Sequence, residues 1–130
     1  MKHKHWSPEV TIPDWAMLSW ESQANQYPPF GEPGVSYFKG DLPSGNYVDC
    51  LLWRDQGGIL RGILNHYPFK SKWEEIGNIN VWVQPGHRRQ GIATALMEEA
   101  MNRWPIDMRQ QRYSAEGAAL VERLMRRVPR

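Results

Sequence analysis

Alternating apolar and polar residues predict β-strands in the middle of the chain. Side chains in residues 75–84 alternate with a period of two, as in a strand with one face toward a core. One face carries Ile79, Val81 and Val83, and the other carries Asn78, Asn80 and Trp82. Upstream, residues 47–55 and 59–67 are strand-like runs separated by Gln56-Gly57-Gly58, which predicts a hairpin. Together the three strands predict an antiparallel meander.

The spacing of apolar residues changes to a helical repeat after this segment. Ile92, Leu96 and Ala100 recur every four residues, so we predict a helix from about residue 94 to residue 104. Pro105 disfavours helical backbone at the residue before it and ends this helix.

The C-terminal part of the chain predicts one more strand and one more helix. Residues 106–112 form the strand, and residues 115–127 form the helix, with Ser114 as its N-cap. A strand, a helix and a second strand in succession predict a parallel pair beside the meander. The expected fold class is α/β (α+β), with a mixed central sheet in which an antiparallel meander precedes a βαβ-type unit.

The N-terminal part shows weaker periodicity. Residues 1–13 are polar and predict an extended arm or a short edge strand. Residues 14–26 predict a helix with Asp14 at its N-cap. Residues 27–46 are rich in proline and glycine, so we predict a loop there.

Composition suits one domain over residues 1–130, of which residues 1–46 are variable and residues 47–128 form the core. The net charge of +2 is too small to indicate a nucleic-acid binder, but it is unevenly spread. Residues 1–85 hold seven Lys/Arg and nine Asp/Glu, whereas residues 86–130 hold nine Arg and five Asp/Glu. The C-terminal third therefore favours an anionic partner.

The sequence predicts a cytoplasmic protein. No apolar run approaches the ~18 residues that span a membrane, and the basic N-terminus lacks the apolar segment of a signal peptide. Cys50 is the one cysteine and lies in the apolar run YVDCLLW, which predicts a buried, inert thiol.

Residues 84–97, QPGHRRQGIATALM, predict an anion-binding loop between a strand and a helix. Free N–H groups at a helix N-terminus favour phosphate, and glycine allows it to approach the backbone. Gly86 and Gly91 have the spacing of a Walker A loop, but Ile92 and Ala93 stand where that loop requires Lys and Ser/Thr. The Rossmann pattern of glycines is also missing.

The pattern Arg88-x-x-Gly91-x-Ala93 resembles the pyrophosphate-binding signature of the GCN5-related N-acetyltransferases. Its context is also similar to that family, with Val83-Gln84-Pro85 before it, a helix start over residues 91–96, and Ser114-Ala-Glu-Gly-Ala-Ala-Leu120 downstream. The resemblance covers residues 47–128 well and residues 1–46 poorly.

This resemblance implies acetyl-coenzyme A as co-substrate, with no metal. It implies that the pyrophosphate binds the loop and the first helical turn. The residues concerned are Arg88, Arg89, Gln90, Gly91, Ile92, Ala93 and Thr94, with Ser114 from the next helix start. It also implies that the pantetheine arm pairs with the backbone of Val81, Trp82 and Val83.

At the positions for acid–base chemistry, the sequence departs from the family pattern. The base position that the resemblance implies falls near Gly77, so Glu75, on the same strand face, is the candidate base; a plain surface charge is the alternative. Val121 stands where relatives carry a tyrosine general acid, and Tyr113, just before the helix, is the candidate acid. His66 is either a second candidate base or a hydrogen-bonded sheet histidine.

The leading hypothesis is an N-acetyltransferase acting on a small-molecule or peptide amine. Two alternatives stay open: a catalytically inactive acyl-CoA-binding or partner-binding module, and, less favoured, a nucleic-acid-binding domain. Relatives continue with two further strands, so we expect a short form whose missing wall comes from the N-terminal region or a second subunit in a homodimer. Aromatic candidates for the acceptor wall are Tyr27, Phe30, Tyr37, Phe38, Trp53 and Trp73.

Overall fold

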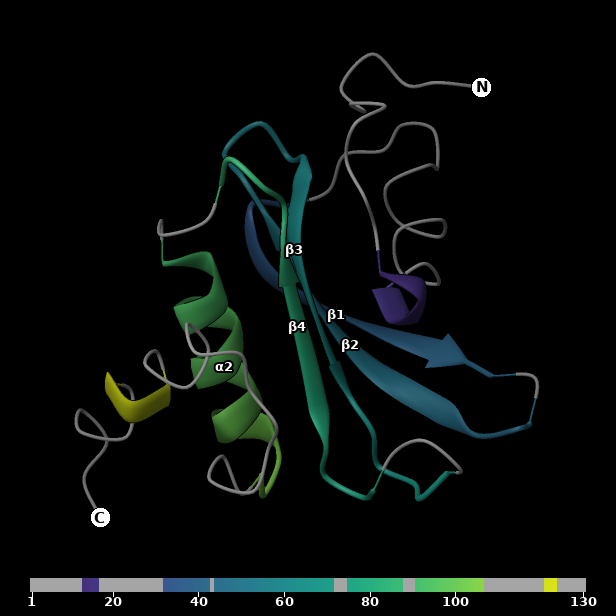
Figure 1. Cartoon of the computed structure of the whole chain (residues 1–130). Helices are drawn as coiled ribbons and strands as arrows, with labels where there is room; N and C mark the ends of the chain where they lie inside the picture. Colours follow the sequence, from purple (N-terminus) through teal and green to yellow (C-terminus); the bar gives the residue numbers. More distant parts are fainter. Residues whose placement is uncertain are drawn as a thin grey trace.

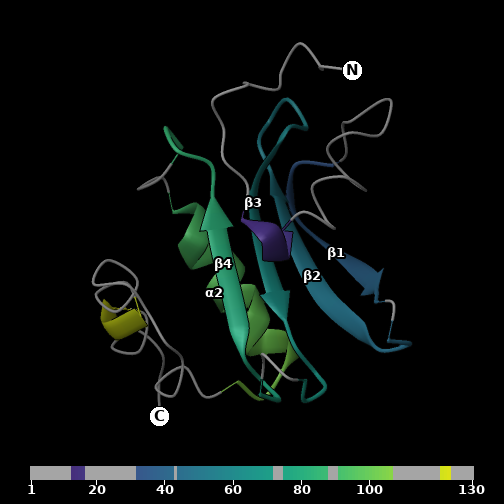
Figure 2. The ribbon, with the colours of Figure 1, turned by 45° about the vertical axis from the view of Figure 1, so that its right-hand side comes forward.

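The computed structural model describes residues 13–16, 32–42, 44–71, 75–87, 91–106 and 121–123. Its elements, in chain order, are η1 (Asp14–Ala16), β1 (Gly34–Asp41), β2 (Tyr47–Arg54), β3 (Leu60–His66), β4 (Ile79–Val83) and α2 (Ile92–Arg103). The four strands form an antiparallel sheet in the order β1-β2-β3-β4. Figure 2 shows them side by side, with β4 at one edge of the described sheet.

Helix α2 covers one face of this sheet, and the short helix η1 lies on the other (Figure 1). The predicted helical stripe is confirmed, because Ile92, Leu96 and Ala100 are buried against the sheet. The same cluster contains Leu51, Leu64, Ile79, Val83, Met97 and Val121. The alternation predicted for the last meander strand is also confirmed, since Ile79 and Val83 face α2.

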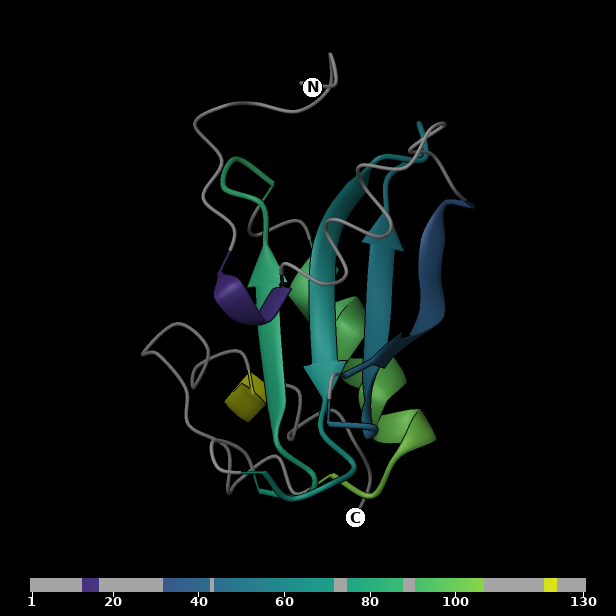
Figure 3. The ribbon, with the colours of Figure 1, turned by 90° about the vertical axis from the view of Figure 1, so that its right-hand side faces the viewer.

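Helix η1 lies against the opposite face of the sheet (Figure 3). A second, smaller apolar cluster lies beneath it. It consists of Ala16, Leu52, Leu60, Ile63 and Trp82. Asn65 attaches η1 to β3, because its Nδ2 donates to the Trp15 carbonyl at 3.0 Å. The sheet is therefore buried on both sides, with α2 as the larger cover.

The loop predicted over residues 27–46 is wrong for its second half, because residues 34–41 form β1. This strand is half-exposed and pairs with β2 on one side, so neither side-chain face gives a clear apolar pattern. The breakers that follow do form a turn, in which Leu42 N–H donates to the Asn46 carbonyl at 2.9 Å. The meander thus has one strand more than the sequence predicts.

Two predicted boundaries also shift. The strand predicted over residues 75–84 is β4, which begins at Ile79, because residues 75–78 form a turn in which Gly77 has a φ of 88°. Helix α2 begins at Ile92, two residues earlier than predicted. The strand predicted over residues 106–112 and most of the last helix lie outside the described residues; residues 121–123 of that helix are helical.

Gly62 on β3 determines how closely α2 approaches the sheet. A Cβ at this position would lie 2.7 Å from Ile92 Cγ2 and 3.1 Å from Leu96 Cδ1. Real Cβ atoms do not make a contact as short as the first, so the N-terminal turn of α2 packs where only a glycine leaves room.

Candidate functional site

The candidate site begins where β4 ends and the chain turns toward α2. Gln84 N–H donates to the Arg61 carbonyl at 2.8 Å, which extends the β3–β4 ladder by one residue. The Gln84 carbonyl then accepts the His87 N–H at 2.9 Å, closing a turn through Pro85 and Gly86. Residues 88–90, which include the predicted Arg88, Arg89 and Gln90, lie outside the described residues.

Within the described residues, the N-terminus of α2 has no side-chain cap. Gly91 is the N-cap residue, with a left-handed φ of 79°. The first bond inside the helix runs from Ala95 N–H to the Gly91 carbonyl, so the amides of Ile92, Ala93 and Thr94 point out of the helix end. These amides, with the helix dipole, favour an anion.

The surroundings of Gly91 leave room for an anion among the described residues. A Cβ built on Gly91 would have no heavy atom of the described residues within 4 Å. The first turn of α2 also carries no acidic residue that would repel an anion. The structure therefore brings Gly91, Ile92, Ala93 and Thr94 together at the N-terminus of α2, where the sequence predicts the pyrophosphate to bind.

The register of β4 separates the three backbone positions predicted to pair with pantetheine. Antiparallel pairs alternate between hydrogen-bonded and non-bonded positions, and Gln84 is bonded to Arg61. Two residues earlier, Trp82 is therefore also bonded to β3, while the backbone groups of Val81 and Val83 point to the outer edge of β4. The Trp82 side chain is buried in the cluster beneath η1.

A chain of polar contacts connects the β2–β3 turn to the start of the loop. Asp55 Oδ2 accepts a hydrogen bond from Arg61 Nε at 3.0 Å, and Arg61 Nη1 donates to Gln84 Oε1 at 2.7 Å. Burial alone would raise the Asp55 pKa, but hydrogen bonds from the Ile59 amide, the Arg61 guanidinium and the Gly57 amide lower it below its ordinary value. Asp55 is therefore held as a carboxylate beside Arg61.

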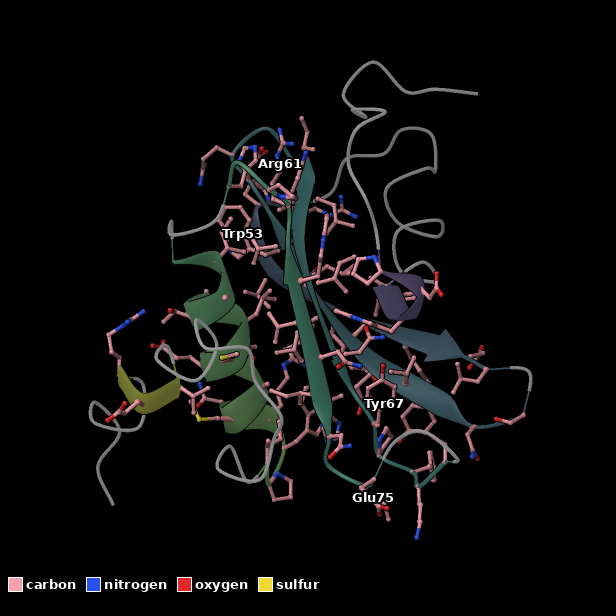
Figure 4. The ribbon with its side chains drawn as sticks, in the orientation of Figure 1. Trp53, Arg61, Tyr67 and Glu75 are labelled. Carbon is pink, nitrogen blue, oxygen red and sulfur yellow. The ribbon has the colours of Figure 1, made fainter. Side chains whose placement is uncertain are left out.

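The predicted base, Glu75, lies in the turn before β4. Its side chain is 71% exposed, and its carboxylate is 3.8 Å from Lys70 Nζ. Figure 4 shows Glu75 and Tyr67 at the end of the sheet opposite to Arg61 and Trp53, which lie near the loop. The candidate acid Tyr113 and the candidate cofactor contact Ser114 lie outside the described residues.

His66 belongs to a buried network under the C-terminal end of α2. Its Nδ1 lies 2.9 Å from Asp49 Oδ2, and both side chains are 7% exposed. Tyr37 donates to the other Asp49 oxygen at 2.5 Å, and the His66 ring stacks on Trp104 at 4.4 Å. Burial and this bond to Asp49 raise the pKa of Tyr37 above its ordinary value.

This network makes His66 a hydrogen-bonded sheet histidine and not an accessible base. Sequence reasoning missed its partners Asp49 and Tyr37. The hairpin register is the signal that could have found the first of them, since Asp49 and His66 are directly paired across β2 and β3.

The proposed acceptor wall needs correction where the structure describes it. Tyr37 lies on the α2 face of the sheet, while Phe38 packs against the cluster beneath η1, so the two cannot line one pocket. Trp53 packs against the α2-side core. Tyr27, Phe30 and Trp73 lie outside the described residues.

Comparison with known protein families agrees with this architecture. Residues 46–126 match the family model described as an acetyltransferase (GNAT) domain. The chain belongs to the GNAT acetyltransferase family. Comparisons with curated proteins and with solved structures gave no match. GNAT membership accounts for the meander that leads into a helix through a Gly-containing loop, and it indicates an acyltransferase in general.

The described residues hold neither a metal centre nor a membrane-spanning helix. No group of three or more His, Cys, Asp or Glu side chains is arranged to hold a metal ion. No helix there is both long and apolar enough to cross a membrane. Cys50 is buried on β2, as predicted.

Proposed function

We propose that this GNAT protein is an acetyl-CoA-dependent N-acetyltransferase. The observation that carries the proposal is the N-terminus of α2 behind Gly91. Among the described residues no side chain caps it and no heavy atom lies within 4 Å of a Cβ built on Gly91, and the first helical turn has no acidic residue. A pyrophosphate fits such a seat, because the amides of Ile92, Ala93 and Thr94 supply donors and the helix dipole favours negative charge.

Arg88, Arg89 and Gln90 are proposed to complete the pyrophosphate seat from the loop, and Ser114 from the following helix start. Arginine suits this role because its fixed fork of donors matches phosphate oxygens. The flanking segments support this placement, because residues 84–87 form a turn after β4 and residues 91–94 begin α2.

The pantetheine arm is proposed to run along the outer edge of β4. There the backbone groups of Val81 and Val83 point away from β3, which is the direction an added strand requires. Trp82 supports the same strand from behind, through its buried side chain. An N–H group on this edge, near the acetyl carbonyl, would stabilise the oxyanion that forms there.

Acetyl transfer requires an uncharged amine, which attacks the thioester carbonyl. A C–N bond forms and the C–S bond breaks. The departing thiolate then takes up a proton. An alkylammonium has a pKa of about 10.4, so a base must remove its proton near neutral pH. We propose Glu75 for this step and Tyr113 for proton donation. The exposure of Glu75 and its long contact with Lys70 leave its carboxylate able to reorient toward an acceptor.

The acceptor class is proposed to be a small-molecule or peptide amine, handled in the cytoplasm. Cys50 is the one cysteine and is buried, so the chain has no internal disulfide, which fits a reducing compartment. A homodimer is proposed as well, in which the second subunit completes the acceptor side.

The direct test is a turnover assay. The protein is incubated with acetyl-CoA and a panel of primary amines and peptides, and release of free thiol is followed together with the mass of the acceptor. Amine-dependent thiol release with a mass gain of one acetyl group supports the proposal. Tight acetyl-CoA binding without turnover on any amine would instead favour a non-catalytic acyl-CoA-binding module.

A further inference from the structure

We infer that Arg61 is a positioning residue for the phosphate-binding loop, acting through Gln84 and held in place by Asp55. This inference rests on the proposed function, because it assigns Arg61 to that same site. Arg61 belongs to β3 and comes from a different part of the chain than the loop.

The geometry that carries the inference is a pair of contacts between the same two residues. Arg61 receives the Gln84 N–H at its carbonyl, at 2.8 Å, and donates from Nη1 to Gln84 Oε1, at 2.7 Å. Both the backbone and the side chain of Gln84 are therefore fixed by one residue of the neighbouring strand. Gln84 in turn accepts the His87 N–H, so its orientation determines the first turn of the loop.

Asp55 pre-organises the guanidinium for this task. One carboxylate oxygen accepts the Gly57 and Ile59 amides at 2.9 and 3.0 Å, and the other accepts Arg61 Nε at 3.0 Å. The carboxylate is thus attached to the β2–β3 turn on one side and to Arg61 on the other. A rigid fork with two different partners is a role that lysine cannot reproduce.

Burial raises the cost of losing the contacts between Arg61 and Gln84. The Arg61 side chain is 16% exposed, and Gln84 as a residue is 8% exposed. Without the guanidinium, the buried Gln84 amide oxygen would lose its donor, and the turn would lose the bond that orients it. Nε and Nη1 both bond within the protein, so through these two nitrogens Arg61 acts on the loop.

The experiment compares Arg61→Ala, Arg61→Lys and Gln84→Met with Arg103→Ala as matched control. Arg103 also forms an ion pair through Nε, to Glu99 at 2.7 Å, but it lies at the other end of α2. The control therefore removes the same charge and the same kind of contact, away from the loop. Each variant is titrated with CoA by calorimetry, and exchange of the His87 amide is followed by NMR.

We expect Arg61→Ala to weaken CoA binding about tenfold and to speed exchange of the His87 amide. Arg61→Lys should recover only part of the CoA affinity and part of the protection of that amide. In steady-state assays KM for acetyl-CoA should rise while kcat stays within twofold. Gln84→Met should reproduce both effects even if Arg61→Ala fails to fold. Arg103→Ala should leave them unchanged.

Two failures are distinguishable. If the wild-type protein binds no CoA, the proposed function is wrong, while exchange at His87 still tests the contact between Arg61 and the loop. If wild type binds CoA but Arg61→Ala and Gln84→Met bind as tightly as Arg103→Ala, with unchanged His87 exchange, the inference about Arg61 is overturned.

Discussion

At the scale of single residues, two glycines with similar backbone conformation are expected to differ in their effect on ligand binding. Gly91 and Gly45 both adopt left-handed backbone, with φ of 79° and 91°, and neither would place a Cβ within 4 Å of a described heavy atom. Gly45 lies in the β1–β2 turn, whereas Gly91 is the N-cap of α2. Only the second position is expected to affect ligand binding.

Gly91→Glu should weaken CoA binding by more than tenfold, because the new carboxylate would occupy and charge the pyrophosphate seat. Gly45→Glu is the matched control, since it introduces the same side chain with similar backbone strain. Calorimetric titration of both variants makes the comparison. Equal affinities for the two variants would argue against an anion seat at Gly91.

Glu75→Gln tests the proposed base. We expect kcat to fall about a hundredfold while KM for acetyl-CoA stays nearly constant, because the amide cannot accept the proton of the amine. Glu99→Gln is the control, because it neutralises a different carboxylate, one that is paired with Arg103. Unchanged kcat in Glu75→Gln would assign the base to another group or to water.

At the scale of elements, the sequence predicts well what periodicity reports and poorly what tertiary pairing decides. The hairpin of β2 and β3 and the stripe of Ile92, Leu96 and Ala100 are confirmed, because buried faces impose a regular spacing. Strand β1 was missed because a half-exposed strand between glycines has no such spacing and depends on pairing with β2.

The candidate site follows the same division. A local motif predicts the loop and Gly91, since the residues of the motif are consecutive in the chain. The contacts of Arg61 and Asp55 with that loop could not be predicted, because they depend on how two strands and a turn come together in space.

Gly62→Ala tests how the sheet positions α2. The added methyl would collide with Ile92 in the first turn of the helix, so we expect a loss of about 2 kcal/mol in unfolding free energy. CoA binding should weaken with it, because the same turn supplies the amides of the seat. Gly57→Ala, whose Cβ would meet only Asp55 Oδ1 at 3.3 Å, serves as control in urea denaturation.

An unchanged stability in Gly62→Ala would show that α2 has room to shift away from β3. Unchanged CoA affinity despite lower stability would separate the position of the helix from the function of its N-terminus.

At the scale of the whole molecule, the two ends of α2 have different tasks. The N-terminal end follows the loop and has no side-chain cap among the described residues, while the C-terminal end contacts the buried Asp49–His66 pair through Trp104, with Tyr37 bonded to Asp49. Such a division allows one end of the helix to bind a ligand while the other maintains its position.

Asp49→Ala should lower the unfolding free energy by about 3 kcal/mol, because it leaves the buried His66 and the Tyr37 hydroxyl without their shared acceptor. Asp41→Ala, an exposed carboxylate on β1, should change it by less than about 0.5 kcal/mol. Urea denaturation measures both. Equal stabilities would mean that the network does not hold α2 to the sheet.

The central claim is that the N-terminus of α2 and the preceding loop bind the pyrophosphate of coenzyme A. Isothermal titration of the wild-type protein with CoA tests it most directly. We predict saturable binding of one CoA per chain with a dissociation constant of roughly micromolar order, displaced by acetyl-CoA. No binding heat, together with no displacement of a labelled CoA by acetyl-CoA, would contradict it.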